Sequence, residues 1–456
     1  MLRRLSGLFR LFPVDFPAGF ALIFCVGLYY NEVKAKPERS AGFKEMRDNM
    51  ENRDLFTMRE LGDRDLEQFN SLLKYAFQVT SDEMLKTGWQ EDEMKYSKAP
   101  MLQNAFVLGW FHGENLASQI VIYPMEVNIQ GERFAMGGIT GVATYPEYAG
   151  RGLIHALMSE CLRHMRENRQ YISILCPYSI PFYRKMGWEV ISDKLSFQIK
   201  DTQLPRRKPV PGMVERVPLD SEDLKNVYEY FALQHHGALI RDEVGWAEYW
   251  RWETEDMIAA IYYNEKHRPL GYVAYSIENE HFNIKELIYL NQEARHRRWN
   301  YISAHFSLIN DVRGYNYTGE PLAFLLEDSE IRETIEPNVM GRIIDVQEFL
   351  SRYPFESFRE DLQLHLRIHD RMAEWNEGDF LLWVKNGEVV CEPCADCEDD
   401  DAAMVEMDIQ TLTTMLMGYK RPTYLYQNER IQADYHLIPY LERLIPIEKP
   451  YFSDYF

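Results

Sequence analysis

The sequence has no excess of positive charge. It contains 50 Lys and Arg residues against 71 Asp and Glu residues, which gives a formal net charge of −21. Nucleic acids and anionic membranes repel such a chain, so the composition argues against both as partners. A cationic small-molecule substrate suits this charge, although solubility alone explains it as simply.

Cysteine is scarce. Of six cysteines, only Cys391, Cys394 and Cys397 lie close together. This excludes the disulfide framework of a small secreted protein. A structural zinc site needs four ligands, and no histidine near this triplet supplies the fourth. We therefore expect no metal site.

A long apolar run is missing near the N-terminus. The uncharged stretch at residues 16–30 follows a basic segment, as in a signal peptide. It is shorter than the ~18 residues of a membrane-spanning candidate, and no A-x-A cleavage site follows. Three interpretations of this N-terminal segment remain open. It is an anchor or signal, a disordered leader, or the result of a mis-assigned start whose true position is Met46, Met50 or Met58. We favour the last, and expect a cytoplasmic protein without stable membrane association.

Apolar residues make up 46% of the chain, which is typical of folded domains. The length allows about three domains of ~150 residues each. The patterns predict a leader at 1–52, a first domain at 53–203, a second at 212–340 and a third at 341–456. A charged, proline-rich linker separates the first and second domains.

The first domain is predicted to be a mixed α/β unit. Hydrophobic periodicity and turn signals indicate strands at 55–61, 105–111, 117–129, 132–144 and 171–176, and helices at 64–77, from 153 onwards, and at 180–186 after a possible Ser179 cap. Leu66, Phe69, Leu72, Leu73 and Phe77 share one face of the first helix.

The second domain partly repeats this order but lacks paired glycines before its last helix, so we interpret it as a copy without a phosphate cradle. The third begins with a strand and helix at 341–354, then a hairpin turning at Asn386-Gly387 and an apolar helix at 409–419.

The stretch "GVATYPEYAGRGLIHALM", residues 141–158, places Gly150 and Gly152 around Arg151 directly before a helix. No Ser, Thr, Asp or Asn is available to cap that helix. Glycines allow an anion to approach the backbone, the first-turn N–H groups donate to it, and the helix dipole attracts it. The pattern therefore indicates a pyrophosphate site, with an ordinary strand-to-helix turn as the alternative.

Together with "ILCPYSIPFYRKMGWE", this stretch resembles the acetyl-CoA site of the GNAT N-acetyltransferases, and more narrowly that of the Eis (enhanced intracellular survival) branch. "VMGRIIDVQEFLSRYPF" and the terminal "YFSDYF" are also similar to that branch, so the resemblance covers roughly residues 55–456. It implies two tandem GNAT domains with mixed α/β sheets, the second without cofactor, followed by a sterol-carrier-protein-like domain. It also implies acetyl-CoA as cosubstrate and a homo-oligomer.

The resemblance assigns cofactor contacts to Val142, Ala143, Thr144, Gly150, Arg151, Gly152, Leu153, Ile154, His155, Tyr178 and Ser179. It makes Tyr183 the general acid and the terminal carboxylate of Phe456 the general base. Two positions depart from the usual GNAT loop: Ala149 stands where Arg or Gln is common, and Ile154 where Gly or Ala is common.

The implied activity is acetyl transfer from acetyl-CoA to an amine of a cationic small molecule, of aminoglycoside or polyamine type. A binding protein that holds an apolar ligand in its third domain, and a protein or peptide acetyltransferase, are the alternatives. Tyr183 could instead be a core residue and Phe456 a frayed end. Packing or surface roles are expected for His112, His235, His236 and Cys176. The tryptophans are candidates for a substrate groove, although core packing suits them at least as well: Trp110, Trp246, Trp250 and Trp252.

Overall fold

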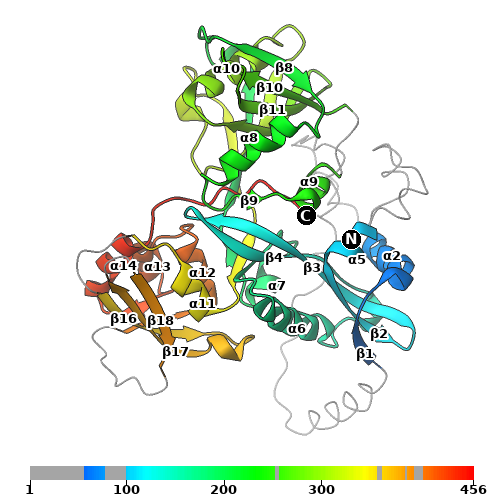
Figure 1. The fold of residues 1–456 in the computed structure, drawn as a ribbon, viewed down its shortest axis with the longest axis vertical. Helices are drawn as coiled ribbons and strands as arrows, with labels where there is room; N and C mark the ends of the chain where they lie inside the picture. Colours follow the sequence, from blue (N-terminus) through cyan, green and yellow to red (C-terminus); the bar gives the residue numbers. More distant parts are fainter. Residues whose placement is uncertain (1–55, 78–98, 252–255, 357–361, 386–387, 395–403) are drawn as a thin grey trace, which may run out of the picture.

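A computed structural model describes residues 56–77, 99–251, 256–356, 362–385, 388–394 and 404–456 (Figure 1). Three β-sheets, each with its own helices, make up this part of the chain. The predicted leader lies outside the described residues, as do Trp252, Asn386-Gly387 and Cys397. Met58 lies within the first strand, so a chain starting there would lack part of that strand.

The first sheet carries the loop Gly150-Arg151-Gly152, called the glycine loop below. Its strands, in spatial order, are β1 (Phe56–Glu60), β2 (Phe106–His112), β3 (Asn115–Ile129), β4 (Glu132–Thr144), β5 (Ile172–Leu175), β15 (Met340–Ile343) and β6 (Glu189–Val190), and β9 (Leu239–Ile240) also pairs with β3. Its helices are α2 (Leu66–Phe77), α5 (Ala99–Asn104), α6 (Leu153–Glu167) and α7 (Ile180–Arg184). The predicted elements are confirmed, but Phe77 is 46% exposed because α2 ends there.

The second sheet repeats the order of the first. Its strands are β8 (Met213–Val217), β10 (Ile258–Tyr263), β11 (Pro269–Glu278), β12 (His281–Tyr289), β13 (Asp311–Asn316), β7 (Asp193–Lys200) and β14 (Arg332–Pro337). Helices α8 (Glu222–Ala232), α9 (Glu243–Trp250) and α10 (Gln292–Ser303) accompany them. α10 connects the parallel strands β12 and β13, as α6 connects β4 and β5.

The two sheets exchange one strand each. β7 follows β6 in the chain, yet it pairs with β13 and β14 of the second sheet. Conversely, β15 follows β14, yet it pairs with β5 and β6 of the first sheet. The sheets therefore cross the predicted boundaries at residues 203 and 341.

The third unit is built on the sheet β18-β17-β16-β19-β20. Its strands are β16 (Leu362–His369), β17 (Gly378–Lys385), β18 (Glu388–Pro393), β19 (Met404–Asp408) and β20 (Gln432–Ala433), and its helices are α11 (Val346–Arg352), α12 (Ile409–Leu416), α13 (Pro422–Gln427) and α14 (Ile438–Leu444). β17 and β18 form the predicted hairpin.

The first and third units share a hydrophobic core, in which the rings of Phe134 and Phe349 lie 5.1 Å apart. A buried ion pair also joins them: Arg342 donates to Asp370 at 2.6 Å and to the carbonyl of Met186 at 2.7 Å. Such contacts fix the units relative to each other. After α14 the chain returns between the first and second sheets and ends beside α9 (Figure 1).

A short 3-10 turn at Pro146–Tyr148 lies between β4 and α6, directly before the glycine loop. No helix within the described residues is both long enough and apolar enough to cross a membrane.

Candidate active site

The strands β4 and β5 separate at the centre of the first sheet. Their parallel pairing runs from Met136 and Ile172 to Ile139 and Leu175, where β5 ends. β4 continues to Thr144, paired only with β3 on its other edge among the described strands. The predicted cofactor residues Val142, Ala143 and Thr144 thus lie where β4 has an edge without a neighbouring strand, and backbone amides of an extended ligand can pair there.

A β-bulge accompanies this separation. Between the pairs Gln119–Ala143 and Val121–Thr140, β4 has one residue more than β3. Gly141 in the bulge has φ +60°, and a Cβ there would lie 2.9 Å from a methyl group of Val121. Because bulges bend and twist a strand, Gly141 helps to turn β4 away from β5.

The glycine loop has the geometry of an anion cradle. Gly150 and Gly152 both have φ +75°, and Gly152 is the N-cap residue of α6 without any side-chain cap. The first helical bond runs from Ala156 N–H to Gly152 O at 3.1 Å, so the N–H groups of the preceding residues stay free of the helix ladder. No atom lies within 4 Å of where a Cβ of either glycine would stand. The space in front of the loop is therefore open to a phosphate group.

The equivalent helix of the second sheet is closed to such a ligand. Asn291 is the N-cap of α10, and its side-chain oxygen accepts a hydrogen bond from Ala294 N–H at 2.8 Å. This amide occupies the position that a phosphate oxygen would take at an uncapped helix. The predicted loss of the cradle in the second copy thus has a structural cause beyond its missing glycines.

Aromatic rings border the glycine loop. The guanidinium carbon of Arg151 lies 5.6 Å from the centre of the Phe56 ring, and that ring stacks on His112 at 5.0 Å. Trp110 donates its indole N–H to Leu153 O at 3.2 Å. His112 and Trp110 therefore support the loop. Ala149 and His155 are exposed, Ile154 is half-buried and Leu153 is buried in the core.

Tyr178, Ser179 and Tyr183 follow the end of β5. Ser179 is the N-cap residue of α7, but its side chain makes no cap hydrogen bond, contrary to its predicted capping role. Tyr178 is 65% exposed, whereas Tyr183 is 4% exposed, and the centres of their rings are 6.1 Å apart. Burial raises the pKa of Tyr183 well above its usual range, and the nearby Tyr178 and Cys176 add to this. Its phenol therefore stays protonated at neutral pH.

The chain end is docked on the first sheet. The Phe456 side chain is 7% exposed and belongs to the shared core. A Cβ on Gly138 of β4 would lie 2.9 Å from the Phe456 ring. The Tyr455 side chain as a whole is 47% exposed, but desolvation raises the pKa of its hydroxyl to about 12, and nearby Cys176 and Glu248 contribute. Gly138 pairs with Ile174 of β5, so the Phe456 ring lies beside the strand that precedes Tyr183 in the chain.

The other candidate residues have packing roles. His236 is buried, accepts from Gln130 N–H at 3.2 Å and contacts Met417 O at 3.0 Å, and burial lowers its pKa to about 4. The ring of His235 stacks on Phe231. Burial raises the pKa of Cys176 to about 12, so it is no thiolate nucleophile at neutral pH. Trp246 and Trp250 belong to the core of the second sheet.

Sequence reasoning missed the residues that hold the chain end. Asp454 is buried and pairs with Arg241, which lies 213 residues earlier in the chain. The only signal in the sequence is one acidic residue within the aromatic tail "YFSDYF".

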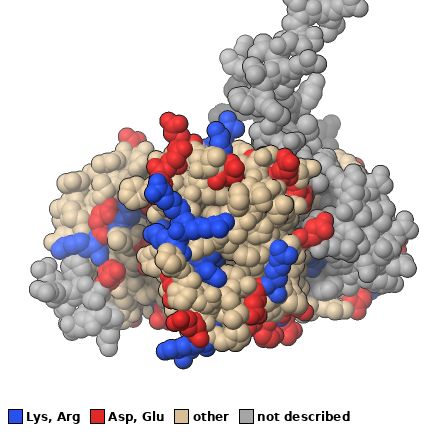
Figure 2. Space-filling view, turned by 90° about the horizontal axis from the view of Figure 1, so that it is seen from above, with Lys and Arg blue, Asp and Glu red and all other residues tan. Residues whose placement is uncertain are grey.

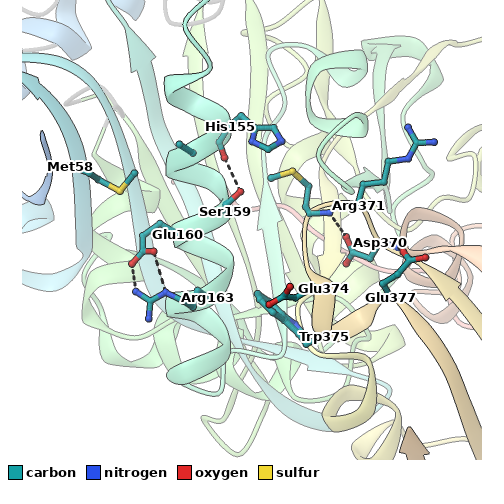
Figure 3. A pocket seen from close by; sticks show the side chains of 12 residues that line it. Met58, His155, Ser159, Glu160, Arg163, Asp370, Arg371, Glu374, Trp375 and Glu377 are labelled. Atoms are coloured by element: carbon teal, nitrogen blue, oxygen red, sulfur yellow. Dashed lines mark hydrogen bonds and ion pairs between the residues drawn. The ribbon is translucent and has the colours of Figure 1, made fainter. Parts of the chain in front are cut away.

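A groove of about 970 Å³ runs beside α6 (Figure 3). One wall comes from α6, with His155, Ser159 and Arg163, and the other from the loop at 370–377 of the third unit. Neither Tyr183 nor Phe456 lines this groove. It therefore adjoins the glycine loop without containing the candidate acid and base.

The net negative charge is not spread evenly over the surface. In the view of Figure 2, Lys and Arg side chains gather near the middle, with Asp and Glu side chains around them. This face is therefore not a uniformly acidic surface that would attract cations. Within the described residues, no cluster of His, Cys, Asp and Glu has the arrangement of a metal site.

Comparison with known families identifies three regions of the chain. The acetyltransferase (GNAT) domain matches residues 57–191, and a second acetyltransferase (GNAT) domain matches residues 237–343. The sterol carrier protein domain matches residues 346–453. No curated protein sequence matches the chain.

Solved structures resemble the chain over most of its length. A probable N-acyltransferase from Enterococcus faecalis is 29% identical with a TM-score of 0.80, over 88% of this chain and 99% of that one. A GCN5-related N-acetyltransferase from Anabaena variabilis is 22% identical with a TM-score of 0.76, over 88% and 100%. Eis1 from Mycobacterium abscessus is 16% identical with a TM-score of 0.72, also over 88% and 100%.

These matches agree with the repeated sheets, the glycine loop before α6 and the separate third sheet. The predicted fold class is thereby confirmed. The chain consists of two tandem GNAT domains and a sterol carrier protein domain, and it is an enzyme of the GNAT acetyltransferase type.

Proposed function

We propose that this enzyme transfers the acetyl group of acetyl-CoA directly to a primary amine of a cationic small molecule, within a ternary complex, and that it belongs to the Eis branch. The proposal rests on three features that occur together in the first domain. These are the uncapped glycine loop, the separated strands β4 and β5, and the buried chain end on β4.

Acetyl-CoA fits the first domain along β4. Its pyrophosphate would accept hydrogen bonds from the N–H groups of the loop at 150–155, with Arg151 adding positive charge. Its pantetheine amides would pair with the edge at Val142, Ala143 and Thr144, and the thioester would then lie between β4 and β5, beside Tyr178 and Ser179. Ala149 supplies no charge where other GNAT loops carry an arginine, so Arg151 provides the local positive charge.

The acceptor must lose a proton before it can attack. An alkylamine has a pKa near 10 and arrives as a cation, which has no free electron pair. We assign this proton transfer to the terminal carboxylate of Phe456, because the chain end is buried on β4 rather than frayed. The carboxylate takes the proton directly or through a water molecule, and the neutral nitrogen then attacks the thioester carbon.

Departure of CoA completes the reaction. The attack forms the C–N bond, and the nitrogen, now positively charged, loses its extra proton to solvent; the C–S bond then breaks and the sulfur leaves as a thiolate. We assign its protonation to the Tyr183 hydroxyl, which burial keeps neutral and which forms no hydrogen bond with another described residue. Solvent then restores the phenol proton.

Tyr183→Phe is expected to lower kcat by about 10²-fold, at the lower end of the usual range for general acids, because a thiolate is a good leaving group. The ring contacts with Tyr178 and Phe182 remain, so melting temperature and acetyl-CoA affinity should change little. Since the Tyr183 pKa lies above its usual range, the unmodified enzyme should show no loss of kcat from Tyr183 between pH 7 and about 9. Steady-state kinetics across this pH range provide the check, and a variant with full kcat would remove Tyr183 from the mechanism.

One acetyl-CoA should bind per chain. The glycine loop is open in the first domain, whereas Asn291 caps the corresponding helix in the second. Isothermal titration calorimetry of the full chain measures the stoichiometry; separate domains are unsuitable because β7 and β15 are exchanged between the sheets. A stoichiometry of two would contradict the closed second site.

The substrate class is tested by thiol release from acetyl-CoA with a panel of acceptors. The panel contains aminoglycosides, polyamines, monoamines and peptides with free N-termini or lysines. We expect turnover with the polycationic small molecules. Turnover with peptides alone would favour a protein or peptide acetyltransferase, and no turnover with any amine would contradict the proposal.

A further inference from the structure

A buried ionic cluster joins the second domain to the chain end. Arg241 donates through Nε to Asp454 at 2.6 Å and through Nη2 to Glu286 at 2.7 Å. The three side chains are 0%, 2% and 1% exposed, respectively. Glu286 lies on β12 of the second sheet, and Asp454 lies two residues before the end of the chain. Arg241 therefore ties the tail to the second domain.

Aromatic groups complete the surroundings of Arg241. Its guanidinium carbon lies 3.6 Å from the ring centres of both Tyr228 and Tyr249. Tyr228 also donates its hydroxyl to Asp454 at 3.1 Å, and Tyr272 donates to Glu286. Two carboxylates thus share one guanidinium in a site closed to water. Because an ion in such a site needs its partner in place, Asp454 has few alternative positions.

The preceding tail is fixed by backbone contacts. Tyr451 N–H donates to His236 O at 2.7 Å, and Asn338 donates its side-chain amide to Phe452 O at 2.7 Å. Gly237 has φ +81°, and a Cβ there would lie 2.5 Å from Pro450. The tail thus follows a defined path along the second domain before it reaches β4.

The distance from Asp454 to the end of the chain is short. Two extended residues span at most about 7 Å, so fixing Asp454 restricts where the terminal carboxylate can lie. Beyond Asp454, the described structure anchors the end through the Phe456 ring on Gly138. Asp454 and this ring together set the position of the carboxylate relative to the separated strands.

We propose that Arg241 is a positioning residue for acetyl transfer, which holds the terminal carboxylate in the active site by binding Asp454. The second GNAT domain lacks an open phosphate cradle. Its role is then to hold the general base of the first domain in place. This inference rests on the proposed function, in which the Phe456 carboxylate is the general base. It gives the second domain a part in a reaction whose cofactor it does not bind.

The test compares Asp454→Asn with Glu286→Gln in the full chain. Both substitutions remove one negative charge from the same cluster and preserve side-chain shape, but only the first weakens the contact between Arg241 and the tail. Carboxypeptidase A reports opening of the tail as release of Phe456. We expect release to accelerate by about 10- to 100-fold in Asp454→Asn, the effect of weakening a charged hydrogen bond. In Glu286→Gln it should remain near that of the unmodified chain, because Arg241 keeps its partner Asp454.

Kinetics then connect the anchor to catalysis. Asp454→Asn should lower kcat with acetyl-CoA affinity unchanged, and Glu286→Gln should retain kcat. In a chain lacking Phe456, Asp454→Asn should cause little further loss of kcat. A residue that acts through the carboxylate has no effect once the carboxylate is misplaced. A role in stability alone would instead lower the melting temperature and activity of both variants.

Results that contradict the proposal distinguish between failure of the anchor, failure of the positioning role and failure of the base assignment. Unchanged release of Phe456 in Asp454→Asn would overturn the anchor, whatever the kinetics show. Faster release with unchanged kcat would overturn the positioning role. If the chain lacking Phe456 is itself fully active, the base assignment of the proposed function fails, and the positioning role fails with it, while the release experiment still decides whether Arg241 holds the tail.

Discussion

Deletion of Phe456 is expected to lower kcat by about 10²–10⁴-fold, the usual contribution of a general base, and to leave acetyl-CoA affinity unchanged. The deletion moves the terminal carboxylate to Tyr455, about 3.3–3.6 Å back along an extended chain. It also removes the ring that packs on Gly138. The glycine loop is untouched, so calorimetric titration with acetyl-CoA and steady-state kinetics should separate binding from turnover.

Two further chains separate the carboxylate from the ring. A C-terminal tag converts the Phe456 carboxylate into an amide, and it should lower kcat as the deletion does. Phe456→Leu keeps both a terminal carboxylate and an apolar side chain against Gly138, and it should retain more activity than either. A fully active tagged enzyme would show that another group or a water molecule removes the amine proton.

Gly152→Asp is expected to weaken acetyl-CoA binding by more than about 10²-fold, because a carboxylate at the start of α6 both occupies the phosphate position and repels the phosphate charge. A new Cβ at Gly152 has open space around it, and Asp tolerates the left-handed backbone at φ +75° better than most residues. The variant should therefore fold. Calorimetry or fluorescence titration measures the affinity, and circular dichroism checks the fold.

Gly152→Asn is the matched control. Asparagine has the same shape and the same tolerance of this backbone conformation, but it carries no charge. It can cap α6 as Asn291 caps α10, so we expect an intermediate loss of affinity. Equal affinities of the Asp and Asn variants would show that charge plays no part, and unchanged binding in both would exclude this helix as the phosphate site.

Local features were predictable from the sequence because their determinants are contiguous. Gly150, Gly152 and the missing cap lie within a few residues of each other, and the backbone preferences of glycine hold whatever the rest of the chain does. The strands and helices of the first domain follow from hydrophobic periodicity for the same reason. The resemblance to GNAT enzymes also rests on such contiguous stretches, and the family matches bear it out at the level of domains.

The exchange of β7 and β15 was not predictable in this way. The side chains of β7 and β15 do not indicate which sheet each strand joins, so only the pairing partner, many residues away, decides where it goes. The bulge at Gly141 likewise depends on the register between β3 and β4.

The sequence by itself determined the number and order of the domains and the presence of one open glycine loop, since short-range backbone preferences and hydrophobic patterns encode both. The tertiary structure decided which distant residues meet: Phe456 on Gly138, and Arg241 on Asp454. Burial is the physical reason. A charge or ring far along the chain has a defined partner only after folding removes both from water, because an unpaired buried charge is costly and an exposed one is free to move.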